Sequence, residues 1–188
     1  MKKKLLASIS FGAVIIYGAM TWSFLSKAAV TDLIVCSLDD GVVFIPKSVC
    51  STYLLNYRDT EEDIKALTAN GGMQFILAGY QREEQTQLSR KSDPQYLNRM
   101  LNITDAYLAN GLDVNQISPS SGLTSLHAEI LANNPVLVKY LLGKGADLNV
   151  KDNRFQLNAV EFTELLIAKN PQVDRTAITQ LLKSNMKQ

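Results

Sequence analysis

The sequence predicts an all-α repeat protein of about 2–3 stacked helix pairs, preceded by an apolar N-terminal helix and a small disulfide-linked segment. Three observations lead to this prediction: an uncharged run from Leu5 to Leu25, a pair of cysteines, and apolar residues of helical period that recur about 34 positions apart near the C-terminus. We therefore expect four segments in the 188 residues, with the bounds 1–27, 28–58, 59–101 and 102–188.

Residues 1–27 are predicted to be a transmembrane anchor or a signal sequence. The uncharged run follows three lysines, Lys2 to Lys4, and as a helix it would be about 31 Å long, which matches the hydrocarbon core of a bilayer. A cleaved signal usually has a shorter apolar region, of about 7–15 residues, and Ser26-Lys27-Ala28 is a poor cleavage site. The length favours a single-pass inner-membrane protein with its C-terminal domain in the periplasm, whereas a cleaved signal would leave a periplasmic protein.

Residues 28–58 contain the two cysteines of the chain, Cys36 and Cys50. Outside the cytoplasm such a pair is expected to form a structural disulfide, which closes a loop of about 15 residues and contributes about 3 kcal/mol in the chain-entropy model. A redox pair would normally have the closer C-x-x-C spacing, and a zinc site would need two further ligands. Between the cysteines, Asp40-Gly41 predicts a turn and residues 42–45 predict a short strand.

Residues 59–101 are predicted to form helices that cap the repeats on their N-terminal side. Asp59 is the expected N-cap of the first of these helices, with Glu62 three residues later. The sequence Asn70-Gly71-Gly72 breaks that helix, and a helical pattern resumes over residues 73–88. Asp93-Pro94 then predicts the start of a further helix, because proline is well tolerated at the first helical position.

The last segment, 102–188, contains its clearest helix pair between Gly122 and Asp152. Thr124-Ser125-Leu126-His127 begins the first helix, and Asn134-Pro135 supplies an N-cap and a first-position proline for the second. The second helix ends at the glycine of Gly145-Ala146-Asp147-Leu148-Asn149. Each helix is apolar on the side that faces its partner, so neighbouring pairs must stack on this unit to bury its remaining apolar surface.

These motifs resemble the ankyrin repeat, whose pattern has a turn glycine, a T-P-L-H-like helix start and a G-A-D-x-N exit. The exit pattern also occurs upstream, where Gly111 lies 34 positions before the corresponding glycine. A weaker copy starts 34 positions downstream at Asn158 and continues to a helix expected after Asn170-Pro171. The resemblance implies an ankyrin-type α-solenoid of about 2–3 repeats, in which His127 has the structural role of bracing adjoining turns.

No catalytic, cofactor or metal site is predicted, and we expect a protein that is not an enzyme. The chain contains no G-x-S-x-G, H-E-x-x-H or Gly-rich phosphate-loop motif, and turns and first helical turns explain its acidic clusters. The formal net charge is +1, and four basic residues lie within the first segment, so the remainder of the chain is net acidic. This distribution argues against nucleic acid as a partner.

The resemblance to ankyrin repeats implies a protein partner that binds to the loop tips and to the exposed side of each first helix. Arg154 beside Phe155 is the most suggestive pair, since arginine and aromatic residues are enriched at binding hot spots; for Leu123 and Phe155, packing beneath the loops is the alternative. Two functions fit: an immunity protein that neutralises a secreted toxin in the envelope, and a periplasmic adaptor for a resident enzyme or complex, for example in oxidative-stress defence. The predicted partner-binding residues are Ser120, Ser121, Leu123, Leu131, Asn153, Arg154 and Phe155.

Overall fold

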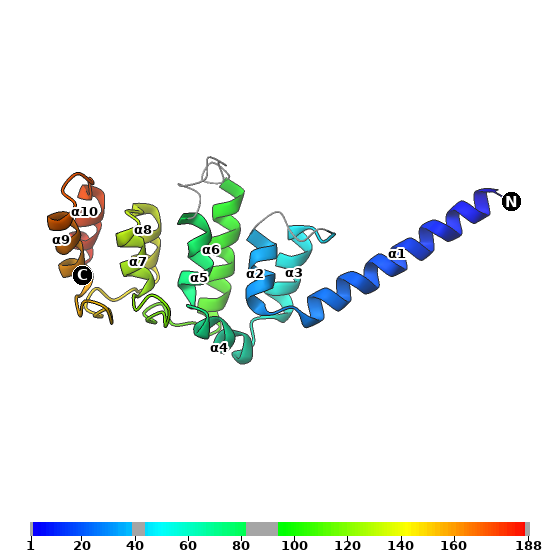
Figure 1. The fold of residues 1–188 in the computed structure, drawn as a ribbon, viewed down its shortest axis with the longest axis horizontal. Helices are drawn as coiled ribbons and strands as arrows, with labels where there is room; N and C mark the ends of the chain where they lie inside the picture. The colour runs from blue at the N-terminus through cyan, green and yellow to red at the C-terminus, as the bar shows by residue number, and fades with distance from the viewer. Residues whose placement is uncertain (1, 39–43, 82–93, 187–188) are drawn as a thin grey trace. The chain divides into compact units, whose positions relative to one another are not determined.

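The computed structural model describes the backbone of residues 2–38, 44–81 and 94–186, and the side chains of residues 14–38, 44–78 and 95–186. Over these residues the chain forms ten helices and no strand, as the all-α prediction requires (Figure 1). The chain divides into two compact units, residues 1–59 and residues 60–188, called unit 1 and unit 2 below.

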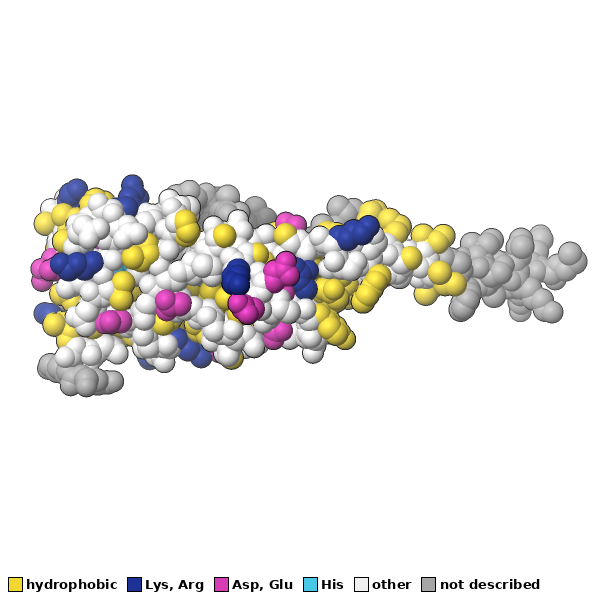
Figure 2. Space-filling view, turned by 90° about the horizontal axis from the view of Figure 1, so that it is seen from below, with side chains coloured by type: hydrophobic (Ala, Val, Ile, Leu, Met, Phe, Trp, Pro, Cys, Tyr) yellow, Lys and Arg dark blue, Asp and Glu magenta, His cyan; other side chains and the backbone are white. Residues whose placement is uncertain are grey.

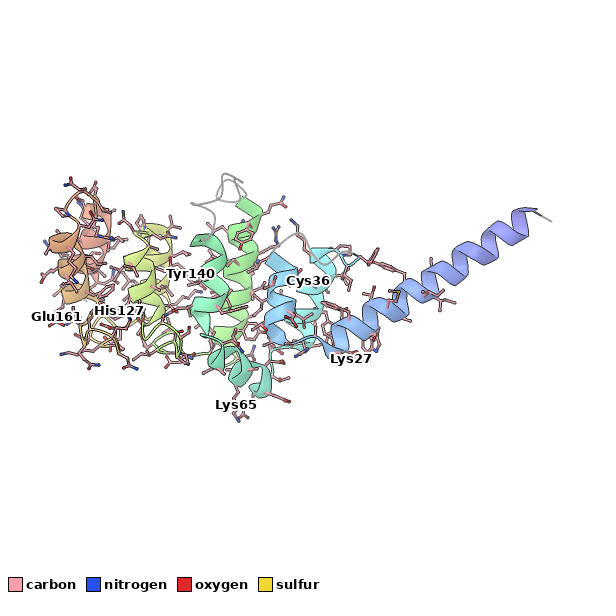
Figure 3. All side chains as sticks on the ribbon, in the orientation of Figure 1. Lys27, Cys36, Lys65, His127, Tyr140 and Glu161 are labelled. Atoms are coloured by element: carbon pink, nitrogen blue, oxygen red, sulfur yellow. A yellow bond between two sulfur atoms is a disulfide. The ribbon has the colours of Figure 1, made fainter. Side chains whose placement is uncertain are left out.

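Unit 1 consists of α1 (Lys2–Lys27), α2 (Val30–Leu38) and α3 (Lys47–Tyr57). The two short helices α2 and α3 pack against each other as a helical hairpin. The predicted disulfide is confirmed: it joins Cys36 of α2 to Cys50 of α3, with 5.9 Å between the two Cα atoms (Figure 3). Apolar side chains buried in this unit include Leu33, Ile34 and Leu54.

The predicted membrane anchor is wrong. In the described part of the chain, no helix is both long and apolar enough to cross a bilayer. The prediction of a single-pass inner-membrane protein anchored by residues 5–25 is corrected accordingly, and the side chains of residues 5–13 lie outside the described ones.

The segment between the two cysteines also differs from expectation. The predicted turn at Asp40-Gly41 lies outside the described residues, as does the first half of the predicted strand at 42–45. In the described half, Phe44 lies in a turn and Ile45 in an isolated β-bridge, so no strand extends over them, and α3 begins after Pro46.

Unit 2 is a row of helix pairs preceded by the short helix α4 (Glu61–Ala69). The pairs are α5 (Met73–Gln81) with α6 (Pro94–Ala109), α7 (Ser125–Leu131) with α8 (Pro135–Gly143), and α9 (Ala159–Lys169) with α10 (Thr176–Asn185). Successive pairs stack, since α7 contacts both α5 and α9, and α8 contacts α10 (Figure 1). The largest side chains buried in this row are Leu67, Met73, Ile76, Leu77, Met100, Ile103, Tyr107, Leu126 and Phe162.

Capping hydrogen bonds explain why α7, α8 and α9 begin where they do. The side chains of Thr124 and Asn134 each accept a hydrogen bond from a main-chain N–H in the first turn of the helix that follows. Pro135 occupies the first turn of α8, as predicted. At α9, Asn158 and Glu161 form a reciprocal capping box, in which the Glu161 carboxylate accepts from the Asn158 N–H at 2.9 Å. These local signals therefore determine the residues at which α7, α8 and α9 begin.

Two predicted features of the capping region need adjustment. The N-cap of α4 is Thr60 rather than Asp59, because the Thr60 hydroxyl is the group that accepts a hydrogen bond from the Asp63 N–H. The helix predicted over residues 73–88 is described as far as Gln81, and its remainder and the predicted N-cap Asp93 lie outside the described residues.

The last helix starts later than its sequence pattern predicts. Asn170 ends α9 instead of capping a new helix, and a turn separates it from the start of α10 at Thr176. Two contacts lie at this start: the Arg175 guanidinium is buried and donates to the Ile130 carbonyl at the C-terminal end of α7, at 2.7 Å, and the Asp174 carboxylate accepts from the Thr176 N–H at 2.9 Å. The Ile130 carbonyl also accepts from the Asn133 N–H at 3.1 Å, and a cation at this end of a helix interacts favourably with the helix dipole. Arg175 therefore fixes the position of the last helix on the preceding pair.

A polar contact also joins α6 to α8. The Tyr140 hydroxyl donates to the Asp105 carboxylate at 2.5 Å, and the Lys144 ammonium lies 2.7 Å from the same oxygen (Figure 3). Burial, and then the hydrogen bond to Asp105, raise the pKa of Tyr140 well above its usual value. The phenol therefore stays protonated and serves as a permanent hydrogen-bond donor between the two helices.

Candidate binding surface

The connections between successive helix pairs lie along one edge of unit 2 (Figure 1). Residues 113–124 lead from α6 to α7 and residues 147–158 lead from α8 to α9; together they are called the loop edge. In the first loop, Gly122 donates to the Ser118 carbonyl at 2.9 Å and has a φ of 71°, a conformation that favours glycine. The first loop thus closes on itself as a tight turn.

The second loop is organised around one buried carboxylate, Asp152. The Asp152 side chain accepts hydrogen bonds from the main-chain N–H groups of Arg154 and Phe155, both at 2.7 Å, and of Leu157 at 3.1 Å. Burial by itself would raise the pKa of Asp152, but these three donors and the nearby His127 lower it below its ordinary value. The carboxylate therefore remains ionised and holds the loop in one conformation.

His127 connects the start of α7 to the second loop. Its Nδ1 lies 2.7 Å from the Thr124 hydroxyl oxygen, and its Nε2 lies 3.1 Å from the Leu157 carbonyl oxygen (Figure 3). A carbonyl oxygen can only accept, so the neutral ring carries its hydrogen on Nε2 and accepts from Thr124 at Nδ1. Desolvation lowers the pKa of His127 and outweighs the opposing effects of the Leu157 carbonyl and of Asp152. The expected bracing role of His127 is confirmed by these contacts.

The loops are also hydrogen-bonded to each other. The Asn153 N–H of the second loop donates to the Gly122 carbonyl of the first at 2.7 Å. A second link runs from the Asp147 N–H to the side-chain oxygen of Asn115, at 2.8 Å. Adjacent repeats therefore share hydrogen bonds at their loops as well as apolar contacts between their helices.

A glutamine on α5 extends this network toward the N-terminal side of unit 2. The Gln74 side-chain amide donates to the Leu123 carbonyl and accepts from the Ser121 hydroxyl, the latter at 2.8 Å. The Gln116 side chain in turn donates to the Thr68 carbonyl of α4 at 2.9 Å. Because of these contacts, the loop edge is tied to the helices that precede it.

Arg154 and Phe155 protrude from this network. The Phe155 ring is 46% exposed, and one of its faces approaches the buried Phe162 ring with 5.9 Å between centroids. The exposed Arg154 guanidinium lies 5.8 Å from the Phe155 ring centroid, a cation–π arrangement. The Arg154 Cγ also passes so close to Gly122 that a β-carbon there would approach it to 2.9 Å. Each of these two side chains therefore packs against other residues of unit 2 on one side and is accessible to solvent on the other.

The seven predicted partner-binding residues fall into three groups. Ser120, Asn153, Arg154 and Phe155 are exposed on the loop edge, and Ser121 is half-buried beside Gln74. Leu131 is 47% exposed at the C-terminal end of α7, apart from the loops. Leu123 is only 3% exposed, so its side chain belongs to the core and is unavailable to a partner. Gln74 is not among the predicted residues, because its contacts with residues 47 and 49 positions away leave no local pattern in the sequence.

Both ring nitrogens of His127 and both carboxylate oxygens of Asp152 are engaged in internal hydrogen bonds. Within the described residues, no group of three or more His, Cys, Asp or Glu side chains could hold a metal ion. Figure 2, which looks onto this side of unit 2, shows a largely uncharged surface with scattered charged side chains.

No family model, no curated protein and no solved structure matches this chain. The likeness to ankyrin repeats is therefore carried by the motif residues themselves and by the contacts that they make.

Proposed function

We propose that this chain is an ankyrin-type repeat protein whose function is to bind a protein partner on the loop edge of unit 2. The observation that carries the proposal is the hydrogen-bonded loop network, in which the Asn153 N–H donates to the Gly122 carbonyl and Asp152 holds the main chain from Arg154 to Leu157. A surface that is ordered before binding loses less conformational entropy when the partner docks.

The ankyrin assignment is supported by the match between motif and geometry. Thr124 caps α7, His127 joins that cap to the Leu157 carbonyl of the next loop, and Pro135 begins α8. These residues lie at the positions that the ankyrin pattern assigns to them, and repeat arrays of this kind offer extended surfaces to partners.

The disulfide supports a location in an oxidising compartment, for which we propose the periplasm. Cys36 and Cys50 are joined and buried, which is typical of structural disulfides in secreted or periplasmic proteins. In this compartment two roles are compatible with a binding surface: neutralising a secreted toxin as an immunity protein, and supporting a resident enzyme as an adaptor. The identity of the captured partner distinguishes them, since a toxin would indicate the first role and a resident envelope enzyme the second.

The proposal is tested by affinity capture with the full chain and identification of bound proteins by mass spectrometry. The variant Arg154→Ala with Phe155→Ala removes the two protruding side chains and is expected to lose the captured partner. The matched control is Lys139→Ala with Val136→Ala, which removes an exposed cation and an exposed apolar side chain from α8. The control should capture the partner like the unaltered chain.

Thermal unfolding of both variants completes the test. Neither pair of substitutions removes a fully buried side chain, so both variants should melt within a few degrees of the unaltered chain. A folded Arg154/Phe155 variant that still captures the partner at full strength would show that the loop edge is not the binding site.

A further inference from the structure

We propose that the second loop is a pH-sensitive part of the binding surface: when His127 takes up a proton, the loop opens and the partner is released. This inference rests on the proposed function and adds the regulation of the same site to it. Three features of the structure carry it: a strained residue within the loop, a histidine that holds the loop closed while it is neutral, and the position of Arg154 and Phe155 between these contacts.

The first feature is backbone strain within the second loop. Gln156 has a φ of 59°, in the left-handed region that residues other than glycine, asparagine and aspartate rarely adopt. Such a conformation persists only where the surrounding contacts impose it. Here the N–H groups on both sides, those of Phe155 and Leu157, donate to Asp152 at 2.7 and 3.1 Å. If these contacts are lost, relaxation of Gln156 favours an open loop.

The second feature is the contact between His127 and Leu157. The Leu157 carbonyl directly follows the strained residue, and it accepts from the Asp152 N–H at 3.0 Å and from His127 Nε2 at 3.1 Å. His127 lies on α7 and is only 1% exposed (Figure 3). Its ring also lies beside the Phe162 ring of α9, with 5.2 Å between centroids. The neutral histidine therefore joins the second loop to the helices that precede and follow it.

Protonation of His127 is unfavourable while the loop is closed. Nδ1 of the neutral ring accepts from the buried Thr124 hydroxyl, and a proton on Nδ1 forces that hydroxyl to turn its hydrogen elsewhere. Among the described residues, the charged group that acts on His127 is Asp152, whose oxygens already accept from three N–H groups of the loop. The imidazolium would thus be buried without a free counter-ion, and burial accordingly lowers the pKa of His127.

Opening of the second loop removes this cost. Water then reaches the imidazolium, so protonation shifts the equilibrium from the closed toward the open loop. The loop is the neighbour of the ring that moves most easily, because residues 153–156 are exposed, whereas Phe162 is 1% exposed. The pKa of Asp152 lies below its ordinary value of 3.8, so this carboxylate stays ionised while His127 changes its charge.

The third feature is the position of the two protruding residues. Arg154 and Phe155 lie between Asp152 and the Leu157 carbonyl, and their N–H groups are held by the Asp152 side chain. When the loop opens, the Phe155 ring leaves its place beside Phe162, and Arg154 leaves its place over Gly122. The affinity for the partner should therefore fall as the pH falls, since the surface is no longer ordered before binding.

Amide hydrogen exchange of the full chain, followed by NMR, tests the opening. Protection factors correct for the direct effect of pH on exchange, and they are compared at about pH 7.5 and about pH 5. Protection of the Phe155 and Leu157 amides should fall about tenfold or more, while that of the Leu141 amide in the core should change less than about twofold. The midpoint of the fall should coincide with the titration of His127, whose ring signal is unambiguous because the chain has no other histidine.

The matched control is His127→Gln, whose side chain can still donate to the Leu157 carbonyl but takes up no proton. Circular dichroism verifies that this variant is folded, and protection of its second loop should not change with pH. The coincidence of the two midpoints is measured on the unaltered chain and does not depend on the variant.

The consequence for binding is measured on the protein partner captured at about pH 7.5. A wash at about pH 5 should release it from the unaltered chain and leave it bound to His127→Gln, because only the first of these carries the titrating group.

Three outcomes would overturn the inference. One is constant protection of Phe155 and Leu157 while His127 titrates; the second is an equal fall of protection in His127→Gln; the third is a partner that the unaltered chain and the variant retain or release alike. The proposed function is judged separately, by capture at about pH 7.5 with the Arg154/Phe155 variant. Capture that does not depend on this pair contradicts the proposed function, whereas capture that depends on it and persists at about pH 5 contradicts only the pH dependence.

Discussion

Unit 1 and unit 2 are both helical, but different kinds of contact stabilise them. In unit 1 a covalent bond between Cys36 and Cys50 joins the two short helices, and apolar side chains along the described part of α1 remain exposed, Val14 and Trp22 among them (Figure 2). In unit 2 the large apolar side chains are buried between stacked helix pairs, and buried polar groups such as Asp152 hold the loops. Unit 1 thus combines a small buried core with one disulfide, whereas unit 2 depends on many repeated contacts.

Because different contacts stabilise the two units, a given substitution should destabilise one unit and not the other. A disulfide acts mainly by restricting the unfolded chain, so its effect is lost when the bond is reduced. In a stacked row each pair contacts only its neighbours, so one defect weakens the interfaces on both sides of it. The single tryptophan, Trp22, lies in unit 1 with its ring 6.2 Å from that of Tyr53, and its fluorescence therefore reports on unit 1 alone.

The largest effect is expected from a cavity in the middle of unit 2. Leu141 of α8 is completely buried, and Leu141→Ala should lower the free energy of unfolding of unit 2 by about 2–5 kcal/mol. Urea denaturation followed by circular dichroism measures this change, and the midpoint reported by Trp22 fluorescence should stay in place. The control Val136→Ala, on the same helix but half exposed, should cost less than about 0.5 kcal/mol. A shift of the Trp22 midpoint by the same amount would show that the two units unfold together.

The complementary change removes the disulfide from unit 1. Cys36→Ser, and equally Cys36→Ser with Cys50→Ser, should lower the free energy of unfolding of unit 1 by about 3 kcal/mol, because the closed loop spans about 15 residues. Trp22 fluorescence should shift to lower urea, while the transition of unit 2 stays where it was. Alkylation of the unaltered, unreduced chain should find no free thiol. Rapid alkylation of both cysteines would contradict the assigned bond.

The same contrast explains what the sequence predicts well. The helix pairs of unit 2 follow from local signals, such as the Thr124 and Asn134 caps and the Pro135 that begins α8, and each signal lies within a few residues of its effect. The disulfide was predictable for a similar reason, since only one pairing of two cysteines exists. Apolar composition by itself was a weaker basis for prediction, since the membrane anchor predicted from the apolar residues 5–25 proved wrong.

Contacts between residues far apart in the chain could not be predicted. Arg175, next to the start of α10, donates to the Ile130 carbonyl, 45 positions away, and no local sequence pattern indicates this partner. Leu123 was predicted to bind a partner, with packing beneath the loops as the alternative, and its exposure of 3% agrees with the alternative. At the binding surface the sequence indicates the protruding pair Arg154 and Phe155, whereas the network that supports it emerges only from the fold.

A smaller effect is expected from the carboxylate that organises the second loop. Asp152→Asn keeps the shape of the side chain, but it replaces one acceptor oxygen with an NH₂ group that faces main-chain N–H donors. The free energy of unfolding of unit 2 should fall by about 1–3 kcal/mol, measured by urea denaturation as above. The control Asp147→Asn changes an exposed carboxylate of the loop edge and should cost clearly less. Equal effects of the two substitutions would mean that burial of Asp152 adds nothing to its role.

The smallest expected effect is a change of stability with pH, which should occur in unit 2 and not in unit 1. His127 is the only histidine, and burial holds its pKa below the ordinary value of 6.5. The unfolded chain therefore binds a proton more readily than the folded one. The contribution of neutral His127 to the stability of unit 2 is thus fully present above about pH 6.5 and is lost as the pH falls through the folded pKa. Asp152, whose pKa is also lowered, adds a further loss only below its ordinary value of 3.8.

Urea denaturation at several pH values between about 7.5 and 5 measures the slope of the free energy of unfolding against pH. The free energy of unfolding of unit 2, followed by circular dichroism, should fall over this pH range. The free energy of unfolding of unit 1, followed by Trp22 fluorescence, should not change. The variant His127→Gln provides the control, because glutamine can still donate to the Leu157 carbonyl but does not titrate. Its stability should be lower than that of the unaltered chain at pH 7.5 and nearly constant down to pH 5. If the slope persists in His127→Gln, another group causes it, and the histidine contacts between α7 and the second loop are insensitive to protonation.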